Sequence, residues 1–218
     1  GDMEMHTAGS LKDGQMVWAL AKTKESFELF DGDVTDNYFL FTNPHQFGKA
    51  INIRMTPIRV VCNNTLTLSL SQNADKMLTV NHRKEFDASE VKEQMGIARE
   101  KMEQYKSMAA HLGSKRYTPD NVIQYFNEVF GAPAKEKVDG VLPFTSRNSK
   151  GAFENLDVQP GAEFAQGTWW TAFNSVTNMT DHLQGRSNDG RLVSSWYGRN
   201  RKVKLNALEK ALEYADAA

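Results

Sequence analysis

Cysteine is almost absent from this sequence, which contains Cys62 alone. No internal disulfide can form, and no group of cysteines is present to hold a structural zinc ion. A single thiol in 218 residues fits a reducing compartment, so we expect a cytoplasmic protein. A chain of this length can bury a hydrophobic core large enough to need neither a metal nor a disulfide.

Long apolar runs are also missing. No segment is long and apolar enough to span a membrane, and the first ten residues, GDMEMHTAGS, are polar and acidic, unlike a signal peptide. We therefore expect no membrane partner. The initial glycine and the internal methionine near it indicate that the natural chain begins upstream, so we expect these 218 residues to be a fragment.

Neither sign of charge is in excess, because 26 Lys and Arg residues face 27 Asp and Glu residues. A nucleic-acid site would therefore be a local patch rather than the whole surface. The five histidines show no metal-ligand spacing such as His-x-x-x-His, which predicts no metal site. Walker and GxGxxG motifs are absent, so NTP hydrolysis and dinucleotide chemistry have no support, and we expect no cofactor.

Strand signals dominate the first ~85 residues. Apolar or alternating segments at 16–22, 26–30, 36–42, 49–57 and 77–83 predict strands, and 36–42 and 49–57 are expected to pair as a hairpin through Gly48. Residues 60–72 are ambiguous. Their alternating leucines favour a strand, whereas Asn63 or Asn64 as an N-cap favours a short helix, which we prefer because β-branched apolar residues are lacking.

Helical signals follow. Residues 87–112 contain no proline and carry apolar residues at spacings of four and three, which predicts a long helix ended by Gly113. Thr118-Pro119 opens a second helix that stops at Gly131, so the two form a helical hairpin. The apolar stripe of the first helix either packs within its own chain or joins subunits into a homo-oligomer. Two more helices are expected at 166–183 and 201–215.

The segment 131–165 is rich in Gly, Pro, Lys, Ser and Asn, and we predict a long loop that is either functional or mobile. The final helices are expected to return to the same core. The sequence thus predicts one α+β domain over residues 1–218, with an antiparallel sheet from the first ~85 residues. The helical hairpin and the C-terminal helices would pack on one face of that sheet.

The strongest local signal is a basic tract at residues 186–204, where six basic residues face Asp189 alone and Trp196 and Tyr197 lie among them. Basic groups neutralise phosphates and aromatic faces stack on unpaired bases, as a single-strand binder requires. The alternative is a solvated charged loop with Trp196 in the core. Arg54 and Arg59, from the predicted strands, would extend this basic surface. Asn63 and Asn64 would lie with Arg59 at the base of the binding groove. The predicted nucleic-acid-binding residues are Arg54, Arg59, Asn63, Asn64, Arg186, Arg191, Trp196, Tyr197, Arg199, Arg201 and Lys202.

Catalytic chemistry has weaker signals. Asp181-His182 is either an acid–base pair or a hydrogen-bonded structural pair. Cys62 with a distant histidine would make a nucleophile pair, but a thiol in Val-Val-Cys behaves as a small hydrophobe. We therefore expect no catalytic residues, and a small hydrolase that uses these groups is the third hypothesis.

Several stretches carry a family resemblance. They are TAGSLKDGQMVWALA at 7–21, FTN at 41–43, TPIRVVCNNTL at 56–66, Trp170-x-x-Phe-Asn-x-Val-Thr-x-x-x-Asp-His at 170–182, and Trp196-Tyr-Gly before a basic helix. On these residues the chain resembles the phage/plasmid-like protein family, an uncharacterised family carried by phages, plasmids and bacterial chromosomes. Its members usually have a further N-terminal region.

The resemblance implies a mobile-element setting in a bacterial host cell and supplies no catalytic residues. The leading hypothesis is therefore a nucleic-acid-binding protein that binds or anneals single-stranded DNA in replication or recombination. The alternative is a non-enzymatic interaction or structural protein that oligomerises through residues 87–112.

Overall fold

The computed structural model describes residues 3–45, 51–61, 64–65, 78–80, 88–185 and 187–218. Its sheet is antiparallel, with the order β1-β2-β3-β4-β5 and with β6 paired to β4. The strands are β1 (Met3–Leu11), β2 (Met16–Glu28), β3 (Val34–Pro44), β4 (Ile51–Arg59), β5 (Asn64–Thr65) and β6 (Leu78–Val80). The predicted antiparallel sheet of an α+β domain is thereby confirmed.

Several strand predictions need correction in detail. The segments at 16–22 and 26–30 form the single strand β2, and β1, which we did not predict, pairs with it through the turn at Lys12–Gln15. β1 is an edge strand with mostly exposed side chains, so it lacks the apolar alternation of a half-buried strand. The short helix expected from Asn64 is a strand there, because Asn64–Thr65 pairs with β4. Residues 62–63 and 66–72 of that segment, and the Gly48 turn, lie outside the described residues.

The chain contains six α-helices among its described residues. They are α1 (Ala88–Ser114), α2 (Pro119–Phe130), α3 (Arg147–Glu154), α4 (Trp169–Asn178), α5 (Asn188–Tyr197) and α6 (Arg199–Asp216), with a 3₁₀ turn η1 (Ala162–Ala165) and a π-helical turn η2 (Met179–Leu183). The N-cap of α2 is Thr118, whose side chain accepts a hydrogen bond from the Asn121 amide, as the Thr-Pro signal predicts. No described helix is long and apolar enough to cross a membrane.

Two helices lie where the sequence indicated irregular chain. The expected loop at 131–165 contains α3, whose N-terminus has a capping box between Ser146 and Ser149, and η1. A capping box that uses serine at both positions lacks the Glu or Gln of the usual signature. The segment before the terminal helix forms α5, capped by Ser187. These elements are short, so their apolar periodicity is too brief to detect from the sequence.

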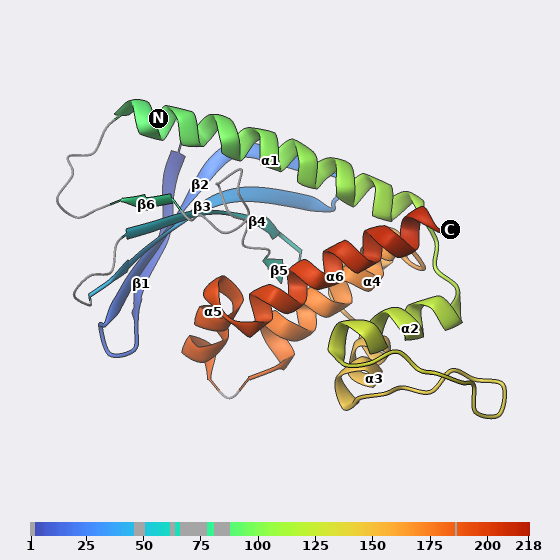
Figure 1. The fold of residues 1–218 in the computed structure, drawn as a ribbon. Helices are drawn as coiled ribbons and strands as arrows, with labels where there is room; N and C mark the ends of the chain where they lie inside the picture. The colour runs from blue at the N-terminus through green and yellow to red at the C-terminus, as the bar shows by residue number, and fades with distance from the viewer. Residues whose placement is uncertain (1–2, 46–50, 62–63, 66–77, 81–87, 186) are drawn as a thin grey trace.

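The two faces of the sheet are covered by different helices. Phe39 and Leu40 are neighbours on β3 and therefore point to opposite faces. The Phe39 side, with Met55, belongs to the main core under α1, whereas Leu40 clusters with Trp196 of α5. Figure 1 shows α1 on one side of the sheet and α5 on the other. The helices thus cover both faces rather than the one face that we expected.

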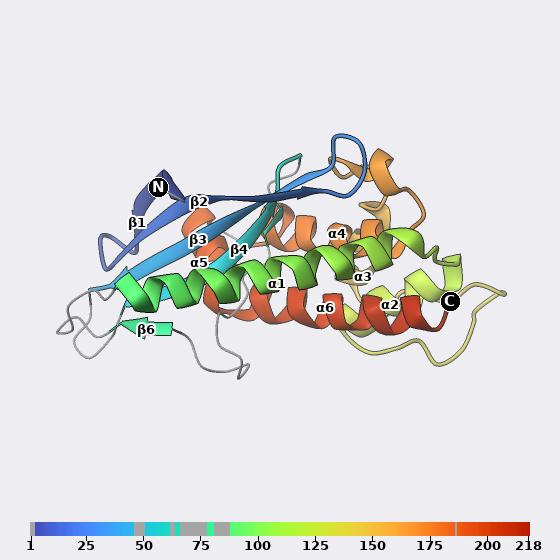
Figure 2. The same ribbon diagram turned by 90° about the horizontal axis from the view of Figure 1, so that it is seen from above.

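The apolar stripe of α1 packs within its own chain. Met102, Tyr105 and Leu112 are at most 5% exposed and belong to the main core. Tyr105 contacts the rings of Phe27 and Trp170 at 6.0 and 6.1 Å between centroids. Seen from above, α1 runs alongside α6 (Figure 2). From Ala98 onward, the stripe is therefore occupied by intramolecular packing.

Candidate functional site

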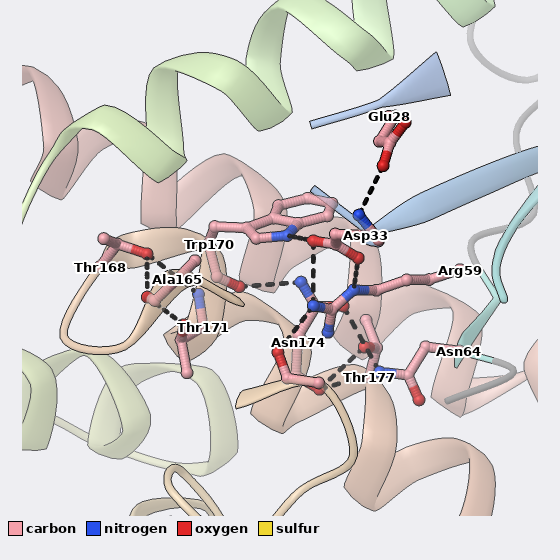
Figure 3. Close-up of polar contacts among 12 residues, drawn as sticks. Glu28, Asp33, Arg59, Asn64, Ala165, Thr168, Trp170, Thr171, Asn174 and Thr177 are labelled. Atoms are coloured by element: carbon pink, nitrogen blue, oxygen red, sulfur yellow. Dashed lines mark hydrogen bonds and ion pairs between the residues drawn. The ribbon is translucent and has the colours of Figure 1, made fainter. Parts of the chain in front are cut away.

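A buried ion pair joins the β2–β3 turn to the end of β4. Arg59 donates from Nε to Asp33 Oδ1 at 2.5 Å and from Nη2 to Asp33 Oδ2 at 3.0 Å. Arg59 also donates to the Gly161 carbonyl at 2.9 Å, and the Trp170 indole donates to Asp33 Oδ2 at 3.1 Å (Figure 3). A buried pair with this many charge-assisted bonds is geometrically specific. Arg59 therefore lies inside the protein, where it ties three segments together, and not on a nucleic-acid groove.

Asn64 extends this network. Its side-chain amide donates to the Asn174 carbonyl at 3.2 Å, and the Asn174 amide donates to the Trp170 carbonyl at 2.9 Å (Figure 3). Asn64 and Asn174 are at most 5% exposed. The two most distinctive sequence stretches, around residues 56–66 and 170–182, thus meet in the interior, where Asn64 donates a hydrogen bond to Asn174. Asn63 lies outside the described residues.

The basic tract divides between surface and interior. Arg199 and Lys202 are exposed, Arg191 and Arg201 are half-buried, and Arg186 lies outside the described residues. Arg199 opens α6 directly after Gly198, and the first turn of that helix contains no acidic residue. The predicted cationic surface is therefore carried by the junction of α5 and α6, which we define as residues 197–202.

The aromatic residues of the tract point inward. Trp196 is 3% exposed and packs edge-to-face on Trp18 of β2, with 5.4 Å between ring centroids. The Tyr197 hydroxyl hydrogen-bonds to Thr42, and the Arg54 guanidinium lies over the Tyr197 ring at 4.6 Å. In this arrangement, the predicted stacking of unpaired bases on Trp196 and Tyr197 has no geometric support. These two rings instead anchor the α5–α6 junction to the sheet.

Arg54 lies beneath the junction rather than at the surface. It is 6% exposed, and its Nη1 donates to the Trp196 carbonyl at 3.4 Å. Burial lowers the pKa of Arg54, and the neighbouring Arg201 lowers it further. A guanidinium remains protonated under these conditions, so Arg54 adds positive charge under the surface that Arg199 and Lys202 form.

Asp181 holds a buried lysine. Lys204 is fully buried, and its Nζ lies 2.7 Å from Asp181 Oδ1, which also accepts a hydrogen bond from Ser195 at 2.8 Å. Burial lowers the pKa of Lys204, whereas the Asp181 carboxylate raises it. His182, by contrast, is exposed. Asp181 therefore neutralises a cation instead of orienting His182, and the acid–base pair has no geometric support. Cys62 lies outside the described residues.

A cavity of about 410 Å³ opens between the sheet and α5. We refer to it as the α5 cavity. One wall is apolar and includes Leu20 and Ile58, and the other side carries Asp181, Ser195 and Arg191. The full lining is Trp18, Leu20, Thr56, Ile58, Asp181, His182, Asn188, Arg191, Leu192, Ser195 and Trp196.

The sheet wall of this cavity contains residues that the predicted site does not include. Trp18 and Leu20 on β2, and Thr56 and Ile58 on β4, are each two residues apart, so each pair shares a face. That alternation was visible in the sequence, but which face would meet a helix was not. In the part of the chain that the structure describes, no group of three or more His, Cys, Asp or Glu residues is placed to hold a metal ion.

Comparison with known proteins supports a family assignment. No curated protein and no solved structure matches the chain. The chain does match a protein family described as "Domain of unknown function (DUF932)", and the match covers residues 1–208. It includes β1 to β6 and the residues that line the cavity, and it extends into α6. The chain therefore belongs to the DUF932 domain family.

Proposed function

We propose that the protein binds nucleic acid, with single-stranded DNA as its partner, through the α5–α6 junction. The observation that carries the proposal is the local concentration of positive charge. Residues 186–204 hold six basic residues and one acidic one, while the rest of the chain holds 20 basic and 26 acidic residues. Lys204 is buried against Asp181, so among the described residues the surface charge of the tract comes from Arg191, Arg199, Arg201 and Lys202. Such a patch attracts a polyanion despite the near-neutral net charge.

The position of these cations strengthens the argument. Arg199, Arg201 and Lys202 lie in the first turn of α6, where the helix macrodipole already presents positive charge. Cations there are unfavourable for the helix by roughly 0.3–1 kcal/mol each. A local electrostatic conflict of this kind is typical of functional sites and is relieved when an anion binds.

The proposed roles follow exposure. Arg199 and Lys202 contact phosphates directly, Arg191 and Arg201 flank them, and Arg54 supports the surface from below. Trp196 and Tyr197 position the junction rather than stack on bases. The resemblance to the phage/plasmid-like family gives the proposed setting, which is replication or recombination of mobile DNA in a bacterial cell.

The test is fluorescence anisotropy of labelled single-stranded and duplex oligonucleotides at two salt concentrations. We expect single-strand binding that weakens with salt, with a log–log slope of about −0.7 for each phosphate contacted. The variant Arg199→Glu/Lys202→Glu should bind at least tenfold more weakly and show a shallower slope. Lys106→Glu/Lys135→Glu is the matched control, because both of its lysines are exposed and lie far from the junction in sequence.

Two results would contradict the proposal. Equal affinity and salt slope for wild type and Arg199→Glu/Lys202→Glu would remove the junction as the binding surface. Equal affinity for duplex and single strand would contradict the strand preference.

A further experiment uses Trp196→Phe, which should lower the melting temperature but leave the salt slope of DNA binding unchanged, because Trp196 packs in the interior.

A further inference from the structure

The α5 cavity has the size and lining of a small-molecule site. Its volume of about 410 Å³ lies within the ~300–1,000 Å³ typical of ligand pockets, which combine apolar walls with a few placed polar groups. Leu20 and Ile58 supply apolar surface, and the edge-to-face pair of Trp18 and Trp196 closes one part of it. Walls that combine aliphatic and aromatic side chains favour an apolar ring face.

Thr56 provides the observation that points to a ligand. It lines the cavity, is 1% exposed, and its hydroxyl has no hydrogen-bond partner among the described residues. The Trp18 indole nitrogen, in the same cavity wall, is likewise buried without a partner in the described part of the chain. An unsatisfied buried polar group destabilises a protein by about 1–3 kcal/mol, so two at one cavity need an explanation. A bound molecule with hydrogen-bonding groups on its ring edge would satisfy them.

The rim of the cavity is polar and cationic. The Arg191 guanidinium donates to the His182 carbonyl at 3.1 Å and also bonds the Asn188 side chain, so it is held in place beside the opening. Arg191 belongs to the basic tract. A phosphate attached to a ring in the cavity would therefore lie at the cavity opening, beside the positive charge of Arg191.

We propose that the α5 cavity binds a nucleobase, with the ring between the apolar walls and the attached sugar phosphate directed to Arg191. The base belongs either to a free nucleotide or to an unpaired position in a strand held by the α5–α6 junction. Only the second source rests on the proposed function. Nitrogen heterocycles match this cavity because their faces are flat and their edges carry both donors and acceptors.

The first experiment is isothermal titration calorimetry with the four deoxynucleoside monophosphates. The ligand 2-deoxyribose 5-phosphate, which lacks the base, is the comparison. At least one nucleotide should bind tenfold or more tightly than the sugar phosphate. If no nucleotide binds better than the sugar phosphate, the free-nucleotide source is excluded.

The second experiment uses Thr56→Val, which keeps the shape and removes the hydroxyl. Its melting temperature should rise, because an unsatisfied buried hydroxyl is lost, while affinity for the base falls roughly five- to tenfold. Thr23→Val is the matched control: Thr23 lies in β2, is 4% exposed, and its hydroxyl accepts a hydrogen bond from the Glu25 amide. That variant should lose stability and keep its affinity. Leu192→Trp, which fills the cavity from α5, should abolish base binding at a wild-type melting temperature.

The third experiment separates the two proposals. A single-stranded oligonucleotide is compared with one of equal length whose central residues are abasic. One combination of results would contradict the base pocket and leave the phosphate surface intact. In it, the abasic strand binds as tightly as the normal one and no nucleotide binds more tightly than the sugar phosphate. The variant Arg199→Glu/Lys202→Glu would still lose strand binding. If nucleotides bind in a Thr56-dependent way but the charge variant binds strands normally, the pocket stands and the proposed function is wrong.

Discussion

Gly9 of β1 lies directly against the indole of Trp18, its partner across the β1–β2 ladder. A β-carbon at Gly9 would fall 2.9 Å from the Trp18 ring, closer than real side chains approach. The absent side chain is thus what allows the indole to pack closely against the edge strand while it contacts Trp196. One wall of the α5 cavity depends on this contact.

Replacing Gly9 with alanine should therefore displace Trp18. Overpacking of a fitted contact costs about 1–3 kcal/mol, so the free energy of unfolding of Gly9→Ala should fall by that amount. Gly96→Ala is the matched control, because a β-carbon at Gly96 meets nothing within 4 Å and the residue lies within α1. That substitution should raise stability by about 0.5–1 kcal/mol, since alanine is the better helix former. Urea unfolding measures both, and equal shifts would contradict the close-contact argument.

The ion pair between Asp33 and Arg59 should be strongly coupled. Both side chains are at most 4% exposed, so removal of one leaves a buried charge without its partner. Asp33→Asn and Arg59→Met should each lower the free energy of unfolding by about 3–5 kcal/mol. The double variant should lose much less than the sum, because no isolated charge remains. A double-mutant cycle by urea unfolding gives the coupling, and strictly additive losses would show that the pair does not tie β4 to the turn.

The Asp181–Lys204 pair predicts a pH-dependent effect. Burial places the folded-state pKa of Lys204 below its ordinary value of 10.5. At pH values between the folded-state pKa of Lys204 and 10.5, the unfolded chain binds more protons than the folded chain. The free energy of unfolding therefore rises with pH across that window. Asp181→Asn removes the group that raises this pKa, so the window widens toward neutral pH. The variant should be strongly destabilised at pH 7 and regain part of its stability by pH 9.

The control for that prediction is Asp181→Asn/Lys204→Met, which lacks the buried Lys204 amine and should lose the additional pH dependence. Asparagine keeps an acceptor for the Ser195 hydroxyl, so the comparison isolates the charge. Urea unfolding at pH 7 and pH 9 gives the slopes. A slope for Asp181→Asn equal to that of wild type would contradict the assignment of the carboxylate as the partner that keeps Lys204 charged.

The local elements were largely predictable because their signals are local. Alternating side chains indicated β3 and β4, the four–three spacing indicated α1, and the Thr118-Pro119 pair marked the start of α2. The charge excess of the basic tract is also a property of sequence alone. Where signals were short or polar, as in β1, α3 and α5, periodicity did not reveal the element.

What the tertiary structure decided is which residues face each other. Arg59 and Arg199 are both arginines in prominent stretches, yet Arg59 pairs with Asp33 inside the core and Arg199 lies in solvent. Trp196 has the sequence context of a stacking residue, but it packs on Trp18, 178 positions earlier in the chain. Burial and partnership depend on contacts between residues far apart in sequence. Composition and periodicity therefore determined the long elements and the charge, whereas only packing decided which polar groups are buried in structural contacts and which lie at the surface.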